Sequence, residues 1–309
     1  GLSGSMRRSM KILITGGSGF IGSNLSKYLL SAGHKVTAVG RSADRQRIRH
    51  ENYRYIAADT TRPGKWQKEA EETEAAVNLT GVTIFKRWTA SYKEMIYTSR
   101  ILTTRHLVAA LPEGRSVALC SASGAGYYGN RGEDILKEDE SVGHDFLAGV
   151  SKDWEKEAWQ AAAKGVRVAV MRFGVVLGKN GGALAKMIPA FKMFVGGSMG
   201  SGKQWFPWIH LDDLMAAVRF IIDHQDVSGP LNFCAPNPAR YRQLAKTLGE
   251  VLGRPSFMPA PAFMIRLAMG EFGDVFLASQ RTIPDRLLKH GFSFQYPDIK
   301  SAIQAVVAE

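Results

Sequence analysis

The residues best placed to do chemistry are the glycines of a turn near the start of the chain, Gly16, Gly19 and Gly22. They follow an apolar run over residues 11–15 that is typical of a buried strand, and they precede an amphipathic segment that is typical of a helix ending near Gly33. Glycines at this spacing let the backbone turn sharply, approach a pyrophosphate and pack a helix against a sheet. The sequence therefore predicts a dinucleotide-binding site, with a ligand-free strand-to-helix turn as the alternative. The contacts expected from this turn are Gly16, Gly19, Phe20, Ile21 and Gly22.

The residues that end the second apolar run indicate which dinucleotide would bind. An acidic residue there would bind the ribose hydroxyls of NAD, whereas an arginine suits the additional phosphate of NADP. The chain has Arg41 followed by Ser42, a planar donor fork and a hydroxyl, so NADP(H) is the predicted cofactor. An ordinary exposed arginine is the alternative. Later strand ends supply further expected contacts, namely Asp59, Thr60, Leu79, Thr80 and Gly81.

Other reaction chemistries lack their residue patterns. No cluster of His, Cys and Asp has metal-ligand spacing, so no metal is expected. No glycine-serine-glycine nucleophile elbow is present, so a serine hydrolase is not expected either. Cys120 and Cys234 lie in apolar contexts, which favours buried packing residues in a reducing compartment over a disulfide.

The elements that must position these residues follow from the hydrophobic pattern. Apolar runs are at residues 36–39, 53–57, 75–79, 117–121 and 166–172, with another at 230–234. Helical patterns are at about 89–111, 150–164, 211–224 and 241–252. A parallel sheet with crossover helices requires this alternation. The sequence predicts an α/β fold, a Rossmann-type doubly wound parallel sheet with a smaller C-terminal substrate lobe.

The expected division of the chain follows from the same pattern. Residues 10–174 are predicted to form the dinucleotide-binding domain, completed by about 205–236. Residues of about 175–204 and 237–309, richer in Gly, Pro and Met, are predicted to form the lobe, which could close over the cofactor. Residues 1–9 are expected to be a tag remnant or a disordered tail.

Composition limits the partners. The 309 residues are 45% hydrophobic, enough for a substantial core, and carry a formal net charge of +12. The densest basic cluster, Arg41, Arg45, Arg47, Arg49 and Arg54, has no accompanying aromatic stacking pattern, so a nucleic-acid partner is not expected. No apolar run is long enough to span a bilayer, so no membrane partner and a cytoplasmic location are expected.

The sequence resembles the extended short-chain dehydrogenase/reductase superfamily, and more narrowly its atypical branch of sugar-nucleotide epimerase-like proteins with a characteristic C-terminal domain. Two motifs carry the wider likeness, the glycine signature at 15–22 and Trp208-Ile209-His210-Leu211-Asp212-Asp213. The narrower likeness rests on residues 78–81, 86–88, 99–100, 126–129, 172–178, 200–202 and 280–281. The resemblance implies that Arg41, Leu79, Thr80, Arg100 and Val176 contact NADP, with Glu94 on the same long helix as Arg100.

The chain departs from the superfamily at the catalytic pair. Active members use a tyrosine four residues before a lysine as the proton carrier of hydride transfer. Lys152 is present, but the position four residues earlier is Ala148. Ser123 is the expected substrate-binding serine, and Ser121 is the alternative. If Ser123 has this role, Ser121 is expected to contact the cofactor. Tyr127 or Tyr128 could replace the missing phenol, although packing against the cofactor or the lobe interface is the favoured role for each. His144 and His210 are further candidates.

Two functions follow from these residues. The first is an NADP(H)-dependent oxidoreductase or epimerase that acts on a small, nucleotide-sugar-like substrate, with Ser123, Lys152 and Tyr127 at its centre. The second is a catalytically weak or inactive NADP(H)-binding regulatory or scaffold protein, which the missing tyrosine favours. The long helices at about 89–111 and 150–164 could serve the core alone or also pair two copies in a homodimer.

Overall fold

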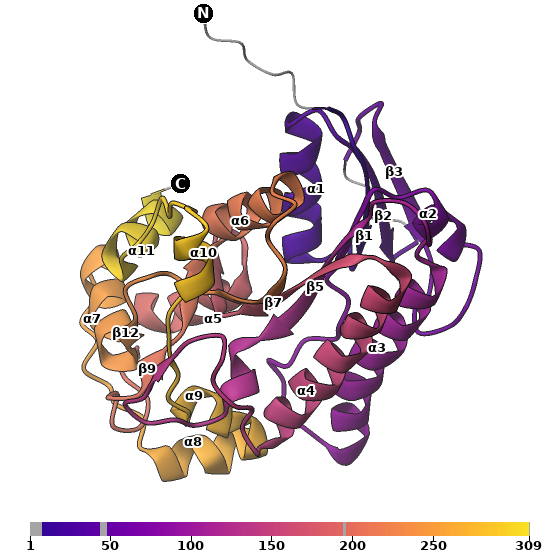
Figure 1. Cartoon of the computed structure of the whole chain (residues 1–309). Coiled ribbons are helices and arrows are strands. Elements are labelled where there is room, and N and C mark those ends of the chain that lie inside the picture. The colour runs from indigo at the N-terminus through magenta and orange to yellow at the C-terminus, as the bar shows by residue number, and fades with distance from the viewer. Residues whose placement is uncertain (1–7, 44–47, 194–195, 309) are drawn as a thin grey trace, which may run out of the picture.

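A seven-stranded parallel sheet forms the centre of the computed structural model, which describes residues 8–43, 48–193 and 196–308 (Figure 1). The strands in spatial order are β11 (Gly229–Phe233), β7 (Arg167–Phe173), β5 (Ala118–Gly124), β4 (Ala75–Asn78), β1 (Lys11–Thr15), β2 (Lys35–Gly40) and β3 (Tyr53–Ala57). The order of connection reverses between β1 and β4, so the carboxyl ends of these two strands border a crevice of the kind in which such sheets bind ligands. The predicted fold class is confirmed.

Helices cover both faces of this sheet. On one face, α1 (Phe20–Ser31) and α6 (Leu211–Asp223) share a core with alternate residues of the strands. On the other face lie α2 (Gln67–Glu71), α3 (Ala90–Ala110) and α4 (Phe146–Trp159), and α3 and α4 run side by side in Figure 1. Burial of both faces explains why the strands have nearly continuous apolar sequences.

A smaller set of elements lies beyond the carboxyl ends of the strands and has its own core. Its members are β6 (Ile135–Leu136), β8 (Val175–Gly178), α5 (Gly182–Lys192), β9 (Trp205–Phe206), β10 (Trp208–His210), β12 (Ala239–Arg240), α7 (Tyr241–Leu252), α8 (Ala262–Met269), α9 (Asp274–Leu277), β13 (Arg281–Thr282) and α11 (Ile299–Ala308). The remaining helix, α10 (Asp285–Lys289), instead packs beside β11, and its Leu287 belongs to the core of the sheet. Leu177, Trp208, Tyr241 and Ile303 are among the buried side chains of this core. The predicted boundaries of two domains stay a prediction.

Three of the four predicted helices, α3, α6 and α7, match the structure to within one residue at each end. The fourth, α4, begins at Phe146, four residues before its predicted start at 150. The reason is Asp145, whose carboxylate accepts a hydrogen bond from the Ala148 N–H at 2.8 Å and caps the additional turn. A short 3-10 helix at Gln160–Lys164 continues α4 to its predicted end.

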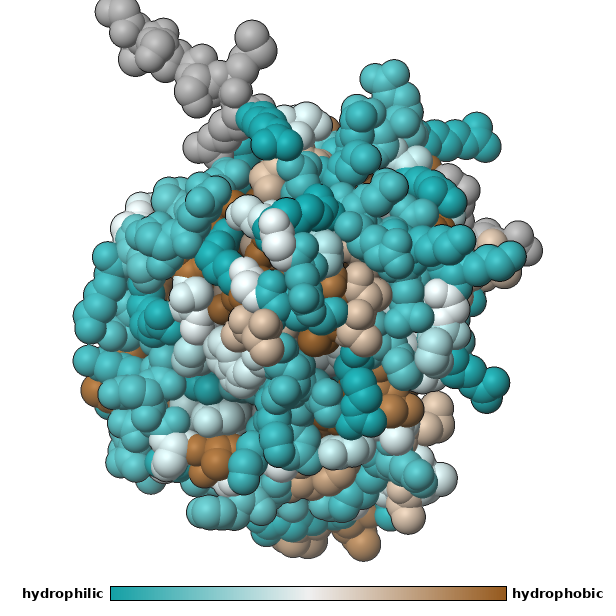
Figure 2. Space-filling model, turned by 45° about the vertical axis from the view of Figure 1, so that its right-hand side comes forward, coloured by the Kyte–Doolittle hydropathy of each residue, from teal (hydrophilic) through white to brown (hydrophobic). Residues whose placement is uncertain are grey.

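The visible surface is mainly hydrophilic, with scattered hydrophobic residues (Figure 2). Several of the most exposed large hydrophobic side chains are in or near α8, namely Phe257, Met258, Phe263, Met264 and Leu267. No helix in the described part of the chain is long and apolar enough to cross a membrane.

Candidate dinucleotide and catalytic site

The glycine turn between β1 and α1 is close-packed backbone. Gly16 has φ of +69°, and a Cβ there would lie 2.8 Å from the Leu79 carbonyl at the end of β4. A Cβ at Gly22 would overlap the carbonyl oxygen of Gly16. Gly19 is different, because its Cβ would lie 3.4 Å from the nearest atom at an ordinary φ. Gly16 and Gly22 therefore shape the turn, whereas Gly19 leaves its outer side open.

The start of α1 is suited to an anion. Its N-cap is Gly19, which has no side chain to accept from the first N–H groups of the helix, and no acidic residue lies in the first turn. These N–H groups and the positive end of the helix dipole favour a phosphate at this position. Phe20, in the first turn, packs against Gly178 and Gly181, so the turn also contacts the segment after β8. Ile21 is half-buried beside it.

The residues expected around the adenine half lie at the ends of β2 and β3. Arg41 is exposed directly after β2, and Ser42 is half-buried. The hydrogen bond from Thr61 and, to a smaller extent, the positive charge of Arg41 hold the pKa of Asp59 below its usual value. Thr60 differs, because its hydroxyl is buried and hydrogen-bonded to the Thr103 hydroxyl at 2.8 Å. Arg41 is therefore exposed to a ligand and makes no ion pair among the described residues, whereas the Thr60 hydroxyl is directed inward.

Beyond β4, two polar side chains have fewer partners among the described residues than their chemistry allows. The hydroxyl oxygen of Thr80 is buried and has no hydrogen-bond partner in the structure described. Arg100 donates to the carbonyl of Ile96 at 3.1 Å and lies over the ring of Trp154, but no carboxylate pairs with it in the described ranges. Burial lowers the pKa of Arg100 to about 10. A Cβ at Gly81 would lie 2.8 Å from the Arg100 guanidinium carbon, so Gly81 makes room for it.

The remaining predicted cofactor contacts have different surroundings. Val176 is half-buried in β8, and Glu94 is exposed on α3. Ser121 is buried, and its hydroxyl oxygen accepts a hydrogen bond from the Asn78 amide at 3.1 Å. Ser121 is therefore part of the polar packing between β4 and β5.

The predicted catalytic serine is held by a carboxylate. Ser123, in β5, donates to Glu155 Oε2 at 2.7 Å. The same carboxylate accepts two hydrogen bonds from Arg172 in β7, at 2.8 Å and 3.0 Å. The side chains of Glu155 and Arg172 are 5% and 4% exposed, so this is a buried ion pair. Burial alone would lower the pKa of Arg172, but the hydrogen bonds and charge of Glu155 outweigh burial and raise it.

The network continues to both tyrosines after β5. Arg172 also donates to the hydroxyl oxygen of Tyr128 at 3.0 Å, and Tyr128 donates to the side-chain carbonyl of Asn232 at 2.6 Å. Burial raises the pKa of Tyr128, so its phenol is harder to ionise. Tyr127 is half-buried, with its ring centre 3.7 Å from the Arg172 guanidinium carbon. No hydrogen bond engages the Tyr127 hydroxyl among the described residues, so it is free to bind a ligand.

On α4, Lys152 and Ala148 have opposite environments. Lys152 is exposed and makes no ion pair in the part of the chain described, whereas Ala148 has no exposed area. A tyrosine at 148 would therefore require its surroundings to rearrange. His210 has a structural role, because its Nδ1 accepts from the Asp212 N–H at 3.0 Å as the cap of α6, and its ring stacks on Tyr296. His144 precedes the cap residue of α4.

The sequence analysis missed Glu155 and the polar role of Arg172. A signal for both was present, since Arg172 ends an apolar strand sequence and Glu155 lies one helical turn after Ser151 on the buried face of α4. An ionisable residue on an otherwise apolar face needs a partner.

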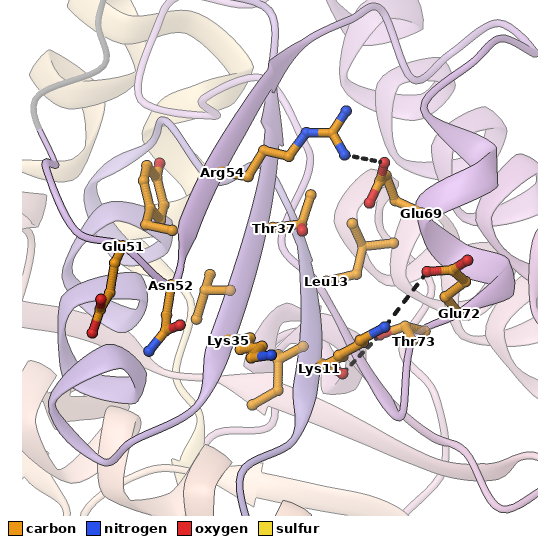
Figure 3. Close-up of a pocket in the computed structure, with 13 residues that line it drawn as sticks. Lys11, Leu13, Lys35, Thr37, Glu51, Asn52, Arg54, Glu69, Glu72 and Thr73 are labelled. Atoms are coloured by element: carbon orange, nitrogen blue, oxygen red, sulfur yellow. Dashed lines mark hydrogen bonds and ion pairs between the residues drawn. The ribbon is translucent and has the colours of Figure 1, made fainter.

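The groove in Figure 3 is separate from this crevice, since it lies at the opposite, amino ends of the strands. It has a volume of about 280 Å³ and is lined by residues of β1, β2, β3 and the end of α2. Its lining has three basic and three acidic residues, so its charges balance, and two ion pairs join them, Arg54 with Glu69 at 2.8 Å and Lys11 with Glu72 at 3.6 Å. The structure as described contains no group of three His, Cys, Asp or Glu residues that could hold a metal ion.

Comparisons with known proteins agree with this architecture. The model of the NAD dependent epimerase/dehydratase family matches residues 12–233, and that of a domain of unknown function matches residues 260–306. The chain is 38% identical to the chloroplastic epimerase family protein SDR39U1 homolog of Arabidopsis thaliana, over 99% of this chain and 89% of that protein. It is 35% identical to epimerase family protein YfhF of Bacillus subtilis, over 97% of this chain and 99% of that protein.

Solved structures extend the likeness. Human epimerase family protein SDR39U1 (isoform 2) with NADPH superposes with a TM-score of 0.84 at 31% identity, over 97% of this chain and all of that chain. A nucleoside-diphosphate sugar epimerase from Corynebacterium glutamicum gives 0.77 at 32% identity, over 97% of this chain and 58% of that one. The chain therefore belongs to the NAD dependent epimerase/dehydratase family, as an atypical short-chain dehydrogenase/reductase similar to the SDR39U1 proteins.

Proposed function

We propose that this protein is an NADP(H)-dependent oxidoreductase or epimerase that acts on a small, nucleotide-linked sugar or a related polar substrate. The observation that carries the proposal is a set of polar groups around the crevice between β1 and β4 that could form further hydrogen bonds or ion pairs with a ligand. These are the first N–H groups of α1, the buried Thr80 hydroxyl and the desolvated Arg100. Their chemistry suits the phosphates and hydroxyls of a dinucleotide. The NADPH of the human structure and the name of the Corynebacterium protein support the cofactor and substrate class.

Each residue of the crevice has a binding role in this proposal. A nicotinamide cofactor supplies hydride transfer when it is bound. The start of α1 would bind the pyrophosphate, and Arg41 with Ser42 would bind the additional phosphate of NADP. Thr80 and Arg100 would satisfy their polar atoms on the same ligand. Lys152, exposed in the turn of α4 that precedes Glu155, would reach the nicotinamide ribose. The two free, buried cysteines suit a cytoplasmic location, which is part of the proposal.

The proton carrier in this proposal is Tyr127. Its ring lies against the Arg172 guanidinium, which favours a developing negative charge on the phenol, and no residue that the structure describes engages its hydroxyl. Ser123 would orient the substrate, but its proton is directed to Glu155. Ser123 therefore accepts from a substrate hydroxyl rather than donating to it. General acid-base catalysis contributes roughly two to four decades of rate, so an imperfectly placed phenol would leave a slow enzyme.

The first test is cofactor preference. Titrations of NADPH and NADH against the wild type and Arg41→Ala should show a preference for NADPH that the variant loses, by about tenfold or more, because charged hydrogen bonds to a phosphate disappear. Arg49→Ala is the matched control, since Arg49 is exposed in the same basic cluster and should leave the preference intact. Equal affinity of the wild type for both cofactors would contradict the NADP assignment.

A second candidate, an NADP(H)-binding regulatory or scaffold protein, is favoured by the buried Ala148 and by the engagement of Ser123 with Glu155. A screen of sugar nucleotides and carbonyl compounds distinguishes the two, with NADPH oxidation and epimeric products both measured. Turnover that falls in Tyr127→Phe supports the enzyme. Tight NADPH binding without oxidation or epimer formation supports the regulatory protein, whose partner must then bind the two forms with different affinities.

A further inference from the structure

A second hollow, on the smaller lobe, has a charge imbalance that the groove of Figure 3 lacks. Its volume is about 440 Å³, and its lining residues are Trp205, Arg240, Arg242, Gln243 and Lys246. Arg242 and Lys246 are exposed, and neither is paired with a carboxylate in the ranges that the structure describes. The lining of the other groove instead has as many acidic as basic residues, and two ion pairs join four of them. We name the second hollow the basic hollow.

The two free cations of the basic hollow are placed at a cost to their own helix. Arg242 lies in the first turn of α7, where the positive end of the helix dipole disfavours a cation. Lys246 follows one turn later, and like charges four residues apart on a helix repel each other. No acidic residue is present in the first turn to offset either effect. Local conflicts of this kind are typical of binding surfaces, where a ligand supplies the missing charge.

Trp205, which lines the basic hollow, faces away from the lobe core. Successive residues of β9 alternate, so that Phe206 packs edge-to-face on buried Tyr241, while Trp205 turns to the outside. The guanidinium carbons of Arg240 and Arg281 lie over the Trp205 ring, 4.3 Å and 4.5 Å from its centre. Arg240 is further fixed by Glu133 at 2.8 Å and by the Lys203 carbonyl. Because cations already cover the ring, a ligand has no free aromatic surface on which to stack.

We propose that the basic hollow binds the di- or triphosphate group of a small ligand, at a site separate from the glycine turn. Arg242 and Lys246 would bind the terminal phosphates, the arginine through its planar fork and the lysine as a mobile point charge. Arg240, held in place by Glu133, would border the phosphate chain. The absence of a free stacking surface directs recognition to the phosphates, so a nucleotide and another phosphorylated compound would share this mode.

The test is isothermal titration of the full chain with inorganic tripolyphosphate at low ionic strength, with and without saturating NADPH. The wild type is expected to bind in both conditions, and Arg242→Ala/Lys246→Ala to bind at least about tenfold more weakly because two charged contacts are lost. The control is Lys65→Ala/Lys68→Ala, which removes the same charge from exposed positions in and beside α2 and should not change the affinity. ATP and a sugar diphosphate, as additional arms, separate the two sources of the phosphate group.

Several outcomes would overturn the proposal. Equal tripolyphosphate affinity in the wild type and the Arg242→Ala/Lys246→Ala variant would show that the basic hollow does not bind it, and an equal loss in the α2 control would show a net-charge effect. Competition by NADPH would assign the signal to the glycine turn. Binding of a single-stranded RNA with no binding of tripolyphosphate would show a nucleic-acid surface instead. If NADPH itself fails to bind, the titration without it still decides the question.

Discussion

At the scale of single residues, the buried Glu155–Arg172 pair determines what the catalytic centre can do. It holds Ser123, Tyr128 and the ring of Tyr127 in one network at the carboxyl ends of β5 and β7. A serine that already donates to a carboxylate cannot donate to a substrate without breaking that bond. The pair therefore positions the residues around it, and the only phenol of this network whose hydroxyl is unengaged among the described residues is that of Tyr127.

Removal of one member of this pair should be strongly destabilising. Glu155→Gln keeps the size of the side chain but leaves the Arg172 charge buried without a carboxylate, which costs roughly 3–5 kcal/mol of the free energy of unfolding. Urea denaturation followed by circular dichroism measures the loss. The control is Glu157→Gln on the same helix, because Glu157 pairs with Arg105, which is 54% exposed, and such pairs contribute about 0–1 kcal/mol. Equal losses for the two variants would contradict the buried pair.

Sequence alone could predict individual site residues only where a local pattern carries the chemistry. The glycines of the turn and Arg41 after β2 could be proposed as cofactor contacts because such roles follow from position relative to a strand end. Glu155 and Arg172 are 17 residues apart, and no local pattern states that they meet. The inward turn of Thr60 onto Thr103 has the same cause, since the partner is 43 residues away on α3.

At the scale of elements, the glycine turn separates two roles that the sequence motif combines. Gly22→Ala should disturb the fold, because its Cβ would overlap backbone atoms of Gly16 and Gly17 that cannot move independently, at a cost of about 1–3 kcal/mol. Gly19→Ala should leave the thermal midpoint almost unchanged yet weaken NADPH binding, since its methyl group would occupy the open side of the turn. Thermal unfolding and NADPH titration of the two variants measure both effects. Undiminished NADPH affinity in Gly19→Ala would argue against a pyrophosphate at the turn.

The elements were predicted well where the hydrophobic pattern extends over many residues. The strands of the sheet and the helices α3, α6 and α7 fall where the sequence indicates, because burial on one or both faces fixes their pattern. The start of α4 was missed because its first turn depends on the cap at Asp145 rather than on period. The two-residue strands β6, β9, β12 and β13 are too short to show any period, and they pair only through tertiary contacts.

At the scale of the whole molecule, assembly stays a prediction. The helices α3 and α4 pack against each other, and their outer surface carries charged groups such as Glu94, Lys152 and the Arg105–Glu157 pair. Met95, 46% exposed on α3, is an apolar residue that a homodimer through these helices could cover. Further exposed hydrophobic side chains lie around α8, in the smaller lobe.

The loop after β4 and the start of α3 contact the smaller lobe, and these contacts predict how the lobe moves. Phe85 in that loop packs on Phe272 and Phe276, at 6.0 Å and 6.3 Å between ring centres. Two polar links reinforce it, Arg87 to the Ala268 carbonyl at 3.0 Å and Lys93 to Glu271 at 2.9 Å. All three contacts join the cofactor side of the sheet to the segment from α8 to α9.

Phe85→Ala should therefore loosen that segment without unfolding the sheet. Two aromatic pairs are worth roughly 1–3 kcal/mol together, so backbone amides of residues 262–277 should exchange with deuterium about tenfold faster or more, while those of β1, β4 and β5 keep their protection. Hydrogen exchange read by mass spectrometry resolves the two regions. Phe257→Ala is the control, because this aromatic side chain is 67% exposed and bridges nothing in the described contacts. Unchanged exchange across 262–277 in Phe85→Ala would mean that the lobe is held closed by other contacts, whereas acceleration confined to this segment would identify Phe85 as the aromatic anchor by which the loop after β4 holds it over the crevice.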